Sequence, residues 1–267
     1  MRVIALTPLD LATGGVLVLV LAGLSVRLRL GLEHALVIAG VRTTVQLLLI
    51  GLVLKALFAH VHLGWVALIA ALMLLAAGRE VMARQQRRFT GLWSFGVGTF
   101  SMFLSSFTVT LLALLVIIGN EPWYTPQYAI PLLGMMLGNT MNGIAVGLDR
   151  LTQTAWQQRA EIEARLMLGH GWSEAITAIR RDSIRGGMIP SINAMAAAGV
   201  VSLPGMMTGQ ILSGTAPVEA VKYQILIMFL IAGGTGFGTM GAVWLGSRRL
   251  FDKRQRLRIE RLREAPR

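Results

Sequence analysis

Blocks of apolar residues, most of them close to twenty residues long and nearly free of charge, run through the whole sequence. Such a block matches the ~20 residues that a helix needs to cross the hydrocarbon core of a bilayer. Lipid offers no hydrogen-bond partners, so a spanning segment must satisfy its own backbone, as a helix does. A chain of 267 residues that is 54% hydrophobic also has too little interior to bury these residues in water. The sequence therefore predicts an all-α membrane protein.

About seven transmembrane helices are predicted, with a turn at residues 120–126, where two prolines and an asparagine interrupt the apolar pattern. A polar arm, residues 149–188, separates the fifth span from the sixth, and residues 246–267 form a basic tail. The predicted spans are residues 9–26, 35–58, 63–77, 95–119, 128–148, 189–212 and 223–245.

The basic residues give the predicted orientation. The first loop, the 79–88 loop, the arm and the tail carry two, four, six and nine of them, which is 21 of the 25 in the chain. Basic loops mark the cytosolic side, so we expect the N-terminus outside, the C-terminus in the cytosol and a multi-pass protein of the cell inner (plasma) membrane. The N-terminal run resembles a signal peptide, but cleavage would break this pattern, so we expect the first span to be retained.

The charge of +12 sits in loops and in the tail, where the expected partner is anionic membrane lipid and not nucleic acid. No Asp or Glu lies well inside a predicted span, whereas carriers driven by protons or sodium rely on buried carboxylates. None of the three lysines follows a glycine, as a nucleotide-binding P-loop requires. These features favour a non-catalytic membrane subunit that binds no cofactor itself and is driven by a separate ATPase, which binds the ATP.

The arm is predicted to fold as two helices. Residues 160–169 favour a short helix ended by Gly169, and Ser173 is the predicted N-cap of a second helix from Glu174 to Arg185. The chain is then expected to turn at Gly186-Gly187 into the sixth span. A helix, a glycine break and a second helix make a compact knob that suits a groove on a partner protein. An amphipathic connector lying on the membrane surface is the alternative that stays open.

Three motifs carry a resemblance to a known family. Glu163-Ala164, with Gly169 five residues later, resembles the EAA loop with which ABC permeases dock their ATPase, although Arg165 replaces the second alanine. With the GNTMNG run (138–143) and the VSLPGMMTGQILSG run (201–214), nearly the entire chain is similar to the small ABC permeases that include the bacterial FetB iron-export permease and plant membrane components of aluminium tolerance. The resemblance implies a permease that pairs with a separate ATPase and exports iron or another metal, contributing to metal and oxidative-stress resistance. It also implies that Glu163, Ala164 and Gly169 couple to that ATPase.

A transport pathway or gate is predicted at polar and helix-breaking residues inside the spans. Proline removes a backbone donor and frees a carbonyl, which membranes tolerate where the backbone is buried or lines water. Snorkelling of the arginine, interhelical hydrogen bonds and core filling by methionine are the open alternatives. Methionine thioethers suit Cu(I) more than iron, and the sequence assigns no metal site. The predicted residues are Arg42, Asn139, Asn142, Asn193, Pro204, Gly205, Met206, Met207 and Gln210.

Two classes of function therefore remain open. In the first, residues 1–267 form one transmembrane permease domain of an ATP-driven metal exporter. Seven spans are few for a complete transporter, so in this case we expect a homodimer with two ATPase subunits. In the second, the chain is a membrane scaffold or secondary carrier whose cytosolic arm binds a partner.

Overall fold

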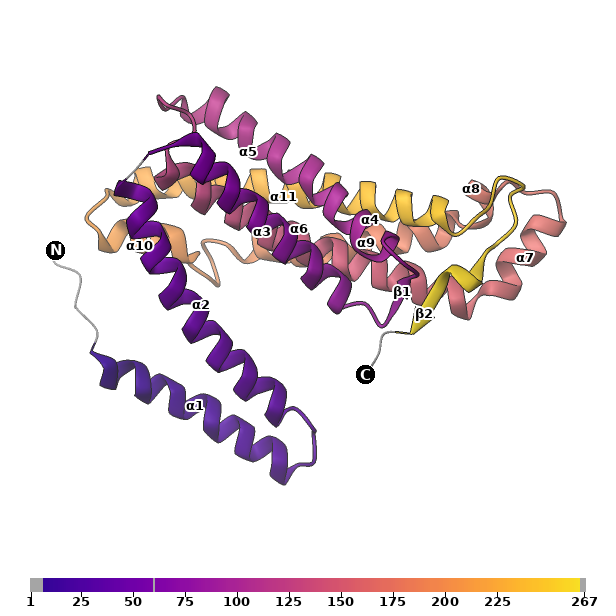
Figure 1. The fold of residues 1–267 in the computed structure, drawn as a ribbon, viewed down its shortest axis with the longest axis horizontal. Coiled ribbons are helices and arrows are strands. Elements are labelled where there is room, and N and C mark those ends of the chain that lie inside the picture. Colours follow the sequence, from indigo (N-terminus) through magenta and orange to yellow (C-terminus); the bar gives the residue numbers. More distant parts are fainter. Residues whose placement is uncertain (1–6, 60, 265–267) are drawn as a thin grey trace.

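The structure is a computed structural model that describes residues 7–59 and 61–264 (Figure 1). Within these residues, six helical segments are long and apolar enough to cross a membrane. This confirms the predicted all-α membrane class. The segments are α1 (Pro8–Arg27), α2 (Glu33–Ala59), α3 (Leu63–Ala83), a rod from Trp93 to Ile118, α6 (Pro126–Gln157) and α11 (Pro217–Arg249). The rod consists of α4 (Trp93–Met102), α5 (Thr108–Leu112) and the π-helical turns η1 (Phe103–Phe107) and η2 (Ala113–Ile118).

The predicted sixth span, residues 189–212, is two helices and not one. α9 (Thr177–Ala197) is followed by a non-helical break at residues 198–204 and then by α10 (Gly205–Leu212). Gly199 adopts a left-handed φ of 81°, and Pro204 lies in extended backbone as the N-cap of α10. Because α6 ends beside the arm and α11 begins at the opposite end of the bundle, α9 and α10 together carry the chain back across it (Figure 1).

Helix backbones approach closely where α6, α9 and α11 meet. A Cβ on Gly187 would lie 2.5 Å from the carbonyl oxygen of Gly143 and 2.7 Å from Cγ2 of Thr239. Only glycine allows two helix backbones to approach this closely. The predicted turn at Gly186-Gly187 is therefore wrong, because α9 runs straight through both glycines and through Pro190, and Gly187 serves packing.

The arm begins later than predicted, because α6 continues through Asp149 to Gln157. At ~1.5 Å per residue its 32 residues span ~48 Å, well beyond the ~30 Å of hydrocarbon. α7 (Arg159–Met167) and α8 (Trp172–Ala175) follow. The predicted cap at Ser173 is wrong. Gly171 precedes α8, and the Ser173 hydroxyl instead accepts a hydrogen bond of 3.1 Å from Arg180.

Residues 250–264, which we call the C-terminal clamp, fold back onto the end of the bundle that carries the arm. β2 (Leu262–Glu264) pairs antiparallel with β1 (Arg87–Phe89), so that Phe89 lies opposite Leu262. Both side chains are buried in the same apolar core as Ile162 of α7. The part of the predicted basic tail that the structure describes is therefore folded against the rest of the protein.

Candidate docking site at the end of the arm

α7 has one buried face and one exposed face, and the predicted coupling residues Glu163 and Ala164 lie on the exposed one. Ile162 is only 1% exposed and belongs to the same core as Ala175 and Ile176. Glu163 and Ala164 are exposed, and within the described residues Glu163 makes no ion pair. The buried isoleucine thus fixes the helix, while the Glu163-Ala164 pair faces solvent.

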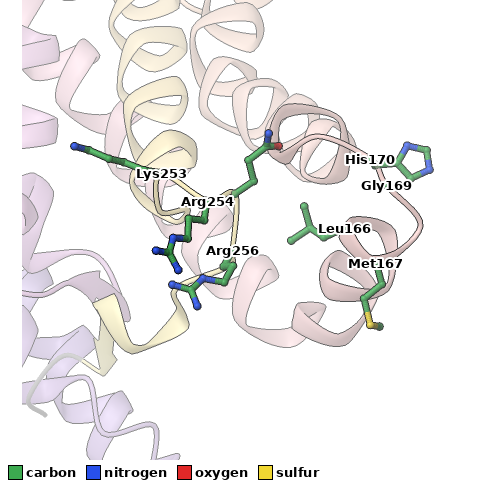
Figure 2. Close-up of a pocket in the computed structure, with 8 residues that line it drawn as sticks. Leu166, Met167, Gly169, His170, Lys253, Arg254 and Arg256 are labelled. Atoms are coloured by element: carbon green, nitrogen blue, oxygen red, sulfur yellow. The ribbon is translucent and has the colours of Figure 1, made fainter.

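The end of α7 presents two apolar side chains to water. Met167 is 82% exposed and Leu168 79% exposed, and Figure 2 shows Met167 projecting from the helix end. Gly169 then adopts φ 91°, a left-handed conformation that ends the helix as predicted. Exposed apolar side chains on the arm make this a candidate docking surface. Residues 163–170 are called the tip below.

A cleft of about 470 Å³ separates the tip from the clamp (Figure 2). The N–H of Trp172 donates a hydrogen bond of 3.0 Å to Oε1 of Gln255, which ties the two walls together. The cleft is lined on the tip side by Leu166, Met167, Gly169 and His170, and on the clamp side by Lys253, Arg254, Gln255 and Arg256.

Asp252 organises the clamp side of this cleft. Its carboxylate accepts the backbone N–H groups of Arg256 and Arg254 at 2.9 and 2.8 Å, and Nε of Arg256 at 2.9 Å. The hydrogen bond from the Arg256 backbone is the largest cause that lowers the pKa of Asp252 from 3.8 to about 2, against the opposing effect of burial. The ionised carboxylate therefore holds the 252–256 turn in place.

The clamp is accordingly expected to loosen in acid. Because the folded pKa lies below the ordinary value, the stabilisation is complete above about pH 4 and is lost as the pH falls toward 2. Hydrogen exchange of residues 250–258, corrected for intrinsic rates, should show lower protection at about pH 2 than at about pH 5. Asp252→Asn should already lower the protection at about pH 5, whereas Asp182→Asn, on the exposed face of α9, should not. Equal protection in the wild type at both pH values would contradict this assignment.

Two of the predicted pathway residues make separate polar contacts near the C-terminal end of α3. Arg42 of α2 forms an ion pair of 2.5 Å with Glu80 of α3, and Arg84, the C-cap residue of α3, donates a hydrogen bond to Asn142 of α6. Glu80 and Arg84 were not predicted as pathway residues because they lie at the end of a predicted span. Their i, i+4 spacing on one helix face was the signal that could have identified them.

The other predicted pathway residues take no part in these two contacts within the described residues. Asn139 donates a hydrogen bond of 2.8 Å to the carbonyl of Met135 in its own helix, and Asn193 is exposed. Met207 is buried, whereas Met206 and Gly205 are exposed. Oε1 of Gln210 is buried without a hydrogen-bond partner in the described part of the chain. Across residues 7–59 and 61–264, no group of three or more His, Asp or Glu side chains is placed to hold a metal ion.

Comparison with known proteins identifies relatives over most of the chain. Residues 8–251 match the sequence profile described as "Uncharacterised protein family (UPF0014)". The chain is 39% identical to the UPF0014 membrane protein slr1647 of Synechocystis over 86% of this chain and 88% of that protein. It is 30% identical to the probable iron export permease protein FetB of Escherichia coli over 96% of each chain. It is also 33% identical to the UPF0014 membrane protein STAR2 of rice, over 83% of this chain and 76% of STAR2.

No solved structure matches this chain. The apolar helices and the membrane proteins among the relatives agree on a multi-pass membrane protein.

Proposed function

We propose that this chain, which belongs to the UPF0014 family, is the membrane-spanning subunit of an ATP-driven ABC exporter, and that a separate ATPase docks on the tip. The observation that carries the proposal is the pair of exposed apolar side chains, Met167 and Leu168, at the end of a rigidly packed helix. The name of the FetB relative makes iron or another metal the proposed cargo, with export contributing to metal and oxidative-stress resistance. The predicted orientation places the tip in the cytosol of a cell whose inner membrane holds the chain.

The packing around the tip supports a coupling role. α7 and α8 are fixed to the core through Ile162 and Ile176, and α9 continues from this core into the bundle without interruption. A force applied to the tip is therefore carried by packed side chains into α9 and on to the break at residues 198–204. Coupling between distant sites needs such a contiguous, rigid connection.

The break itself supports a homodimer. Val200 and Val201 are 89% and 83% exposed, and the break that holds them is followed by α10, whose eight residues rise ~12 Å toward the opposite end of the bundle. Irregular backbone at membrane depth is tolerated where protein buries it or where it lines a water-filled cavity. A second copy packed against the break would bury it, and the pathway would then lie at the interface between the two copies.

A cysteine placed in the break should therefore cross-link two copies. The chain contains no cysteine, so Val200→Cys introduces a single thiol. We expect a disulfide-linked dimer on mild oxidation in membranes, detected by gel electrophoresis without reductant. Leu17→Cys, 72% exposed on α1, is the matched control and should remain monomeric on the gel. Monomer alone from Val200→Cys, or equal cross-linking of both variants, would contradict this interface.

Reconstitution into sealed vesicles tests the proposed function directly. Metal transport should require the ATPase and ATP together, and the ATPase turnover should change when the permease is present. The source organism's ABC ATPases that lack membrane spans of their own are the candidates to be combined with the permease in turn. Transport by the lone chain in ATP-free vesicles would overturn the proposal and favour a secondary carrier.

A further inference from the structure

We infer that the C-terminal clamp forms the second wall of the docking site, and that the cleft takes an acidic amphipathic segment of the ATPase. This rests on the proposed function, and it names the chemistry of the partner surface. The sequence profile of the family ends at Phe251, so the cleft's basic wall lies outside the part of the chain that the profile describes.

The charge of the clamp wall points to carboxylates on the partner. Lys253 and Arg254 are exposed, and neither makes an ion pair within the described residues, whereas Arg256 is paired with Asp252 at 2.9 Å. Lys253 and Arg254 line the cleft, and Figure 2 shows the charged ends of both side chains on the side of the clamp away from the tip. Two cations without internal partners thus stand on the clamp at the edge of the cleft, where they form a basic rim.

The opposite wall requires an apolar face on the same partner segment. Leu166 and Met167 border the cleft from α7, opposite the basic rim. A partner segment that fills the cleft meets apolar side chains on one side and cations on the other. An amphipathic segment with carboxylates along one edge satisfies both walls, since complementary charge fixes register and speeds encounter.

The clamp is rigid enough to act as a wall. Beside the β1–β2 pairing, Nη1 of Arg261 donates hydrogen bonds to the carbonyls of Arg249 and Phe251, at 2.7 and 3.1 Å. The Phe251 ring lies 5.8 Å from the Trp172 ring, and the Arg248 guanidinium lies 5.2 Å from the same ring. The cations are therefore presented from folded backbone at a fixed distance from the tip.

The position of the cleft favours a protein over a lipid headgroup. With the predicted fifth span ending at Leu148, the last nine residues of α6, 149–157, add ~14 Å, and α7, which carries the tip, follows them. Anionic lipid attracts basic segments only within about a Debye length of its surface, which is ~8 Å at physiological salt. The partner is thus assigned as protein, and lipid becomes an outcome of the test.

Charge reversal on the clamp tests the inference. Lys253→Glu with Arg254→Glu should weaken binding of the ATPase to the full-length permease by about tenfold or more at low salt, and should flatten the dependence of affinity on salt. Arg181→Glu with Arg185→Glu makes the same charge change on the exposed face of α9 and should bind like the wild type. Affinities would be measured with the permease in nanodiscs of zwitterionic lipid. A charge-reversed acidic residue on the ATPase that restores binding to the clamp variant would identify the contact.

The outcomes separate this inference from the proposed function. If no ATPase binds the wild type, the proposed function itself fails. If Met167→Asp with Leu168→Asp abolishes binding but the clamp variant binds like the wild type, the inference is overturned and the proposed function stands. A loss of binding by the clamp variant that appears only in discs with anionic lipid would assign the rim to lipid and overturn the inference as well.

Discussion

Replacing Met167 and Leu168 together with aspartate is expected to abolish docking of the ATPase and ATP-driven transport, while the chain stays folded. Both side chains are about four-fifths exposed, so their replacement removes no internal packing. At an interface, central apolar anchors carry at least about 2 kcal/mol each, which is about 30-fold in affinity. Two carboxylates at the same place must in addition be desolvated against the partner, which raises the cost of docking further.

Co-purification and ATPase turnover would measure this loss. Leu92→Asp, at an 89% exposed leucine before α4, is the matched control and should leave docking intact. Ile162→Asp provides the opposite comparison, because it buries a charge in the core and should unfold the arm. If the double variant still docked with wild-type affinity, the tip would not belong to the interface, and the main support for an ATPase partner would be lost.

The spans were predictable because the length and apolarity of a block are local properties. Within the described residues, a helical segment long and apolar enough to cross a membrane matches every predicted span except the sixth. Hydropathy does not distinguish one helix over residues 189–212 from two helices joined by a break, because it reports the average polarity of a segment and not its backbone conformation. Pro204 indicated the place, but the left-handed Gly199 that accompanies the break has no local signal of its own.

The glycines show why packing was harder to predict than length. Glycine allows a turn and also allows close approach of two helices, and only the distant partner decides between these uses. The partner of Gly187 is Gly143, more than forty residues away. The two adjacent glycines therefore predicted a turn where the structure has a continuous, tightly packed helix.

The candidate site also has one part that local sequence rules predict and one part that depends on distant contacts. The end of α7 at Gly169 follows a local rule for helix C-termini, and it was predicted correctly. The clamp depends on pairing between residues 87–89 and 262–264, two strands of three residues each that are too short to leave a pattern. The ion pair between Arg42 and Glu80 also joins distant segments. Contacts of this kind appear only once the helices are placed.

Replacing Gly187 with valine is expected to destabilise the whole bundle. A Cβ at this position would lie 2.5 Å from the Gly143 carbonyl oxygen, which is backbone and cannot rotate away, so α6 and α9 must separate. Overpacking a tight core costs about 1–3 kcal/mol or more, and valine adds a branched side chain at the closest point. The transition temperature in detergent should fall by many degrees, measured by fluorescence-detected size exclusion after heating.

Alanine at three helical glycines provides the control series. Gly138→Ala meets no atom within 4 Å and should stabilise slightly, since alanine favours a helix by ~0.5–1 kcal/mol over glycine. Gly186→Ala meets the flexible side chain of Arg150 at 3.2 Å and should be nearly neutral, whereas Gly187→Ala should destabilise. If Gly187→Ala proved as stable as Gly138→Ala, α9 would not be held against α6. Motion at the tip would then have no rigid connection to the break at residues 198–204, and the coupling proposed for α9 would fail.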